Sequence, residues 1–156
     1  MTGFDSIQVK FQNVNYYKSP FPNTRTVPFV GSYFDVLKAV VHDVTTEYFW
    51  LFASFCKLDR NFDWDYIPEQ HEKDQIHVWY STHPKAGLNK EGNVLLIPTK
   101  AFKEQMQDLK YLRDYKDINY HPVDDLWYPV ITRHNAVLGQ MSEAYNKTEL
   151  ALYKWV

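Results

Sequence analysis

The sequence predicts an α/β protein, a sandwich built on a mixed, mostly parallel sheet. Two observations lead to this fold class. Apolar, strand-like runs alternate with segments of helical periodicity, in the order strand, helix, strand, loop, two strands, helix and strand. At 156 residues, with 45% hydrophobic and 23% charged residues, the chain can bury one core and is typical of a folded domain.

The first half of the chain predicts a helix followed by a strongly apolar strand. Residues 32–44 (SYFDVLKAVVHDV) carry apolar side chains at helical spacing. Residues 48–54 (YFWLFAS) follow as a strand that we expect to be buried on both faces of the sheet. Before the helix, residues 12–17 (QNVNYY) read as the end of a short strand, joined to the helix by a proline-bearing connection.

The second half predicts two strands and a longer helix. Residues 75–81 (QIHVWYS) alternate apolar and polar positions as a strand does. Residues 82–92 read as a loop by their Pro, Gly and Asn content, and residues 93–98 as another strand. Thr99 is expected to be the N-cap of a helix that runs to about Asp114.

A possible internal sequence repeat divides the chain into one long and one short part. The segment QNVNYY at 12–17 returns as KDINYH at 116–121, and further matches keep the same order about one hundred residues apart. We therefore expect a module at 1–121 and an incomplete second repeat at 122–156, a helix plus a strand packed on the same sheet. That last strand, LALYKWV, needs a neighbour. Further repeats or a homo-oligomer are the alternatives that would cover it.

Charge and cysteine content exclude several classes of protein. The net charge of −2 does not favour a nucleic-acid binder, whose surface carries a basic excess. The chain has one cysteine, no basic-apolar leader and no apolar run near the roughly 20 residues of a membrane span. No glycine-rich phosphate motif is present. These features predict a cytoplasmic protein without a membrane partner.

The order of motifs over residues 26–121 also carries a family resemblance. The run TEYFWLFASFCKLDRNFDWDYIPEQHEKDQIHVWYSTHP, then NVLLIPTKAFKEQ and DINYH, is similar to glycosyltransferase-like modules of large, repeat-containing proteins from tailed phages of marine bacteria. The resemblance implies a GT-A fold and work in phage glycosylation in the infected host cell. An active member would use a nucleotide sugar and Mn²⁺ or Mg²⁺, with a glycan or modified DNA as acceptor.

One departure from that family pattern puts its chemistry in doubt. GT-A enzymes usually place an Asp-x-Asp, which holds the metal, at the end of the strand that corresponds to YFWLFAS. Here that place reads Ala53-Ser54-Phe55-Cys56, without a carboxylate. No metal ligand is therefore assigned. Two functions stay open: a degenerate glycosyltransferase-like domain, and a non-catalytic binding or assembly module that keeps the fold.

Several residues could replace the missing motif. Asp63-Trp64-Asp65 is formally an Asp-x-Asp, but aromatic residues alternate with the two aspartates, which predicts an extended segment with one packed and one wet face. Asp59 lies nearer the strand end, where a turn or capping role is the alternative. On the next strand His77 and Trp79 are expected to form a second core on the face opposite Ile76.

The predicted ligand site lies where the two strands end. Ligands of open α/β sheets bind at the carboxyl ends of strands. We expect one cleft that joins Asp59 and His83 as catalytic residues to Ser54, Ser81 and Lys85 as substrate-binding residues. Lys85 would suit a phosphate, or else be a solvated loop charge, and His83 could donate a hydrogen bond or carry a proton near neutral pH.

Overall fold

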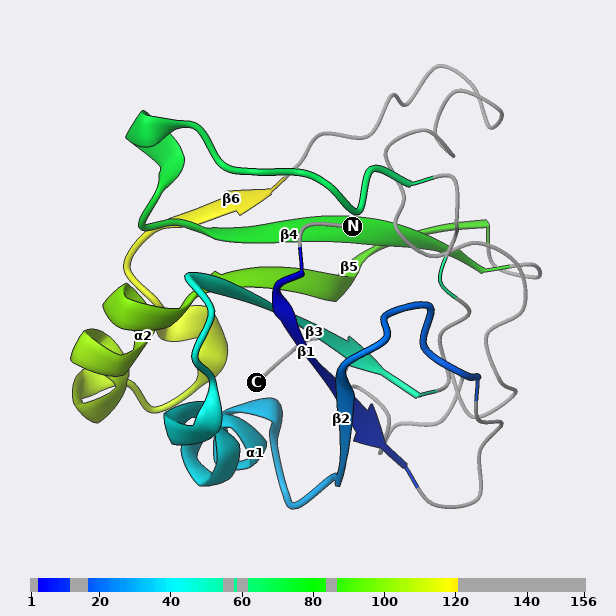
Figure 1. Ribbon diagram of the computed structural model, residues 1–156, viewed down its shortest axis with the longest axis horizontal. Coiled ribbons are helices and arrows are strands. Elements are labelled where there is room, and N and C mark those ends of the chain that lie inside the picture. The colour runs from blue at the N-terminus through cyan, green and yellow to red at the C-terminus, as the bar shows by residue number, and fades with distance from the viewer. Residues whose placement is uncertain (1–2, 12–16, 55–57, 59–61, 84–86, 121–156) are drawn as a thin grey trace.

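The computed structural model describes residues 3–11, 17–54, 58, 62–83 and 87–120, with the backbone alone at 80–93 and 120. This part of the chain forms six strands and two α-helices with short 3₁₀ turns (Figure 1). The elements are β1 (Asp5–Lys10), β2 (Thr24–Pro28), α1 (Tyr33–Val40), β3 (Tyr48–Ala53), β4 (Ile76–His83), β5 (Gly87–Pro98), α2 (Thr99–Gln105) and β6 (Ile118–Tyr120).

All six strands belong to one mixed sheet, in the order β2-β1-β3-β5-β4-β6. Strand β1 pairs in parallel with β2 and β3, and β4 pairs in parallel with β6. Strand β5 lies between β3 and β4 and runs antiparallel to both. Five strands therefore share one direction, which confirms the mixed, mostly parallel sheet and leaves β5 as the reversed strand.

One face of the sheet is covered by the two helices. Phe102 of α2 is fully buried, with ring centroids 6.3 Å from Phe34 of α1 and 6.4 Å from Phe49 of β3. Ser32 caps α1 by accepting a hydrogen bond from the Asp35 amide at 3.0 Å. The apolar spacing of residues 32–44 thus forms the helix that the sequence predicts, with its last residues in a 3₁₀ turn.

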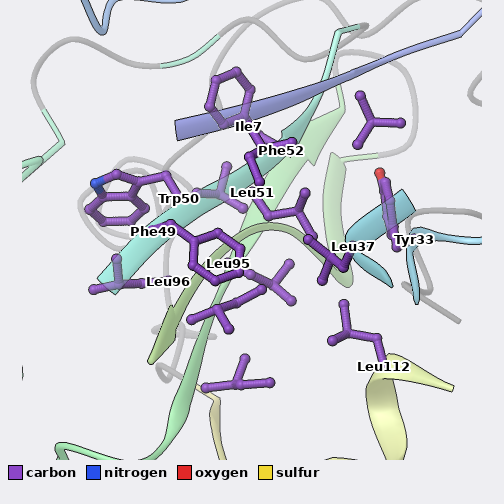
Figure 2. Close-up of a cluster of buried hydrophobic side chains, with 14 of the residues drawn as sticks. Ile7, Tyr33, Leu37, Phe49, Trp50, Leu51, Phe52, Leu95, Leu96 and Leu112 are labelled. Atoms are coloured by element: carbon purple, nitrogen blue, oxygen red, sulfur yellow. The ribbon is translucent and has the colours of Figure 1, made fainter. Parts of the chain in front are cut away.

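The opposite face is packed by aromatic side chains from segments without helices. Trp50 of β3 lies 5.1 Å from Trp64 and 5.5 Å from Trp79, measured between ring centroids. Figure 2 shows Trp50 on the other side of β3 from Leu37 and Tyr33 of α1. Every residue of β3 is buried, because its alternate side chains enter two different cores.

Two expectations about the strands are wrong. Strand β2 occupies part of what the sequence reads as a proline-bearing connection, and it ends at Pro28 on the edge of the sheet. The predicted loop at 82–92 is mostly strand, because β4 continues to His83 and β5 begins at Gly87. Asn and Gly content indicated a loop there, whereas cross-strand pairing forms a long hairpin.

The helix after β5 is also shorter than predicted. It ends at Gln105 and continues only as separate 3₁₀ turns. Its N-cap is Pro98 rather than Thr99, whose amide instead donates to the carbonyl of Glu47 at 3.0 Å. Leu112 is fully buried and reaches the core from a separate 3₁₀ turn.

The predicted repeat can be placed only in part. Strand β6 contains the INY of the second copy and forms the edge of the sheet beside β4. The matching residues 12–16 and all of 122–156 lie outside the described residues, so the division at 121/122 stays a prediction. No helix of the described residues is both long and apolar enough to cross a membrane.

Candidate functional site

The carboxyl ends of β1 and β3 lie side by side at the point where the strand order of the sheet reverses. From β1 the chain continues to β2 on one side, whereas β3 pairs with the other side of β1. Such a switch point opens a crevice in α/β sheets. Here it is tied together by backbone hydrogen bonds, from the Ser54 amide to the Val9 carbonyl at 2.8 Å and from the Tyr17 amide to the Ser54 carbonyl at 3.0 Å.

Ser54 is the one residue of the predicted site whose side chain the structure describes, and it is completely buried. Its Oγ accepts a hydrogen bond from the Phe11 amide at 3.3 Å, just after β1. A serine hydroxyl can accept two hydrogen bonds and donate one, so the bond from Phe11 uses one of its three possible hydrogen bonds. With no exposed surface, however, this side chain would contact a ligand only after the surrounding segments had moved.

Sequence reasoning missed Gln8, a second polar residue at the switch point. Gln8 lies on β1 and is 1% exposed. Its Nε2 donates to the carbonyl of Tyr17 at 2.7 Å, and its Oε1 accepts from Thr26 Oγ1 at 3.3 Å. The sequence signal that could have identified Gln8 is its position as a polar residue between the apolar Ile7 and Val9. The amide links the exit of β1 to edge strand β2.

The other predicted site residues are placed less fully. Ser81 and His83 belong to β4 by their backbone, beyond the row in which Phe52 and Trp79 both pair with Val94. Strands β3 and β4 therefore end at the same edge, as the single cleft requires. The site as predicted also needs β3 and β4 to be neighbouring strands. That expectation is wrong, because β5 lies between them. Asp59 and Lys85 lie outside the described residues, and the five-residue cleft stays a prediction.

The formal Asp-x-Asp has the packing that its aromatic neighbours predict. Asp63 and Asp65 are exposed, while Trp64 is buried. The backbone is a turn rather than the expected extended segment, because the Tyr66 amide bonds to the Asp63 carbonyl at 3.2 Å. The Asp63 carboxylate accepts the Asp65 amide at 3.1 Å. That local bond gives Asp63 the turn-forming role common for aspartate.

His77 and Trp79 form part of the second core, as predicted. Both are buried, and the His77 ring lies 6.0 Å from the Trp79 ring and 5.5 Å from that of Tyr66. Burial lowers the pKa of His77, against the raising effects of the Glu72 carbonyl and of the Glu72 and Asp117 carboxylates. The imidazole is therefore a neutral core group.

One set of side chains in the described part of the chain has the spacing of a metal site. Ligand atoms of Glu69, His71 and Glu72 lie within 4.8 Å of one another on the turn before β4. Glu69 and His71 are exposed. Asn119 Nδ2 donates to Glu72 Oε2 at 2.8 Å. This set lies beside the start of β4, not at the carboxyl edge where the family would hold its metal.

Comparison with known proteins adds no family to this description. No protein-family model, curated protein or solved structure matches the chain. The functional argument therefore depends on the chain's own residues.

Proposed function

We propose that this chain is a glycosyltransferase-like α/β module of the phage type that has lost metal-assisted sugar transfer. A sheet whose strand order reverses at β1, with β2 on one side of it and β3 on the other, is in keeping with that proposal, since α/β domains bind nucleotides at such a point. The observation that carries it is Ser54, a buried hydroxyl at the position where the resemblance calls for a metal-binding carboxylate.

The surroundings of Ser54 support the loss of metal chemistry. Its Oγ is used by the Phe11 amide, and its backbone is bonded to Val9 and Tyr17. Ser54 therefore links the ends of β1 and β3 by hydrogen bonds. A metal ligand at this position would instead need a side chain that reaches solvent. The exposed aspartates at 63 and 65 do not replace it, because Asp63 closes its own turn.

Calorimetry tests this proposal. The full chain is titrated with UDP, GDP and their sugars, with Mn²⁺ and again with EDTA. We expect weak binding or none, and no gain from the metal. A micromolar affinity that depends on Mn²⁺ would overturn the proposal. Each titration is repeated with His71→Ala, because Glu69, His71 and Glu72 are spaced to bind Mn²⁺ by themselves.

A non-catalytic binding or assembly module is the second candidate. It is favoured by the same burial of Ser54, which gives this edge a structural role. Metal-independent binding of a nucleotide sugar, followed by slow release of free sugar, would favour the degenerate enzyme. Absence of nucleotide binding in both buffers would leave the assembly module as the better account.

A further inference from the structure

Two adjoining cavities lie at the amino edge of the sheet, where β3 begins and β5 ends. The first, of about 470 Å³, is open to solvent and lined by residues 44–47 and the start of α2. The second, of about 320 Å³, extends past Pro98 to Lys73 and Asp74. They share three lining residues (Glu47, Lys100 and Glu104) and so form one depression, here called the amino-edge groove. Each volume is within the range of small-molecule sites.

The walls of the groove are held by hydrogen bonds from different elements. The Thr99 amide donates to the Glu47 carbonyl at 3.0 Å, and Lys103 Nζ donates to the Val44 carbonyl at 3.2 Å. At the far end, Tyr48 Oη donates to the Lys73 carbonyl at 2.9 Å. A groove with fixed walls loses little conformational entropy when a ligand binds.

The lining carries equal numbers of both charges. Among the described residues, three lysines (Lys73, Lys100 and Lys103) and three acidic residues (Glu47, Asp74 and Glu104) line the groove. The ion pairs found among the described residues lie elsewhere, and none joins two of these six side chains. Charged groups of both signs therefore line the groove without ion pairs to one another, and Lys103 can use donors other than the one that binds Val44 to bind a ligand.

We propose that the amino-edge groove binds a small zwitterion of the amino-acid or dipeptide class. The ligand's ammonium group binds Glu47 and Glu104, and its carboxylate binds Lys100 and Lys103, as charge-assisted hydrogen bonds. A ligand with a single charge would meet as many like charges as opposite ones. Among the described residues the lining contains no aromatic side chain on which a sugar ring could stack.

Thr99 adds an independent indication of a polar ligand. It lines the larger cavity and is 7% exposed, and its Oγ1 has no hydrogen-bond partner among the described residues. Buried hydroxyls nearly always have a partner, and a bound molecule is one explanation of an exception. The zwitterion's carboxylate, held at Lys100 and Lys103, is an acceptor that this hydroxyl could reach after a rotation about χ1.

The test uses the full chain, labelled with ¹⁵N, and glycylglycine as the probe. Acetate, methylammonium and glucose serve as the single-charge and neutral comparators. We expect saturable amide shifts at 45–47 and 99–104 with glycylglycine alone. Glu104→Gln should weaken that binding roughly tenfold or more, the effect of one lost hydrogen bond to a charged group. Asp108→Asn, at an exposed carboxylate outside the groove lining, should not change it.

Two results would overturn the inference. One is the absence of a saturable shift at these amides up to tens of millimolar glycylglycine. The other is an equal response to acetate or glucose, which would identify unspecific ion or polyol binding. Neither result bears on the proposed function, because the groove lies at the edge opposite Ser54.

Discussion

Tyr115 donates a hydrogen bond of 2.6 Å to the carbonyl of Asp74, so a residue just before β6 holds the turn that leads into β4. The preceding carbonyl, of Lys73, accepts from Tyr48 Oη at 2.9 Å. One residue earlier still, the Glu72 carbonyl lies 3.3 Å from His77 Nε2. Side chains from three parts of the fold therefore bind three successive carbonyls of a turn that has little regular structure of its own.

Removing the hydroxyl at Tyr115 should loosen this turn without emptying the core. For Tyr115→Phe we expect a loss of about 1 kcal/mol in the free energy of unfolding, the usual contribution of one hydrogen bond. Urea denaturation measures it. Tyr111→Phe is the matched control, since the ring of Tyr111 is half-buried beside Lys110 and Arg113. Equal losses in both variants would contradict the assigned role of the Tyr115 hydroxyl.

Acid should destabilise the protein through His77. Burial lowers the pKa of His77 below its ordinary value of 6.5, so the unfolded chain binds the proton more readily than the fold. The free energy of unfolding should therefore decrease as the pH falls below about 6.5 and level off beneath the folded pKa. Urea midpoints from pH 8 to pH 5 measure this slope.

A variant without the titrating ring checks that assignment. His77→Phe keeps an aromatic ring beside Trp79 and should flatten the slope between pH 6.5 and pH 5. His71→Gln, at an exposed histidine, should leave it unchanged. An unchanged slope in His77→Phe would assign the acid sensitivity to other groups.

Alkaline pH should act through tyrosines around the same turn. Burial raises the pKa of Tyr48 and that of Tyr66 from 10.0 to about 12. A raised folded pKa means stability that is complete below pH 10 and is lost as the pH rises toward 12. The ultraviolet absorbance of tyrosinate should show a late titration that coincides with unfolding. Tyr48→Phe should reduce its amplitude, and a titration completed near pH 10 would refute the prediction.

Substitutions at Ser54 test whether this position can bear a carboxylate. Ser54→Ala removes the buried hydrogen bond between the Phe11 amide and the Ser54 hydroxyl and should cost about 1–3 kcal/mol. Ser54→Asp places an ionised group where no exposed surface remains, and should cost about 3 kcal/mol or more. Thermal and urea denaturation compare the two. A Ser54→Asp variant as stable as the parent, with new Mn²⁺ binding, would show that the metal site is restored by one residue.

The helical face of the core should be sensitive at Phe102. This ring is fully buried between Phe34, Phe49 and Tyr115. Phe102→Ala should lower the free energy of unfolding by about 3–5 kcal/mol through lost burial and a cavity. If the variant does not fold, Phe102→Leu, expected to lose less, keeps the prediction measurable. A change below 1 kcal/mol in Phe102→Leu and Phe102→Ala alike would mean that α2 contributes little to the core.

The sequence by itself determined the elements whose signals are local. The apolar run at 48–53 predicted a buried strand, because only a strand with two covered faces is apolar throughout. Helical spacing over residues 32–44 predicted α1, and alternation predicted Trp64 and Trp79 in a core and an exposed Asp63. Ser54 was also identified from sequence, as the residue in the place of a carboxylate.

Tertiary pairing decided the rest. Strand β2 has mostly exposed or half-buried side chains and exists because its backbone pairs with β1, which a composition pattern does not record. The length of the β4–β5 hairpin, the position of β5 between β3 and β4, and the early end of α2 likewise depend on partners distant in sequence. The amino-edge groove could not be predicted, because its charges come from three separate segments that only the folded sheet brings together.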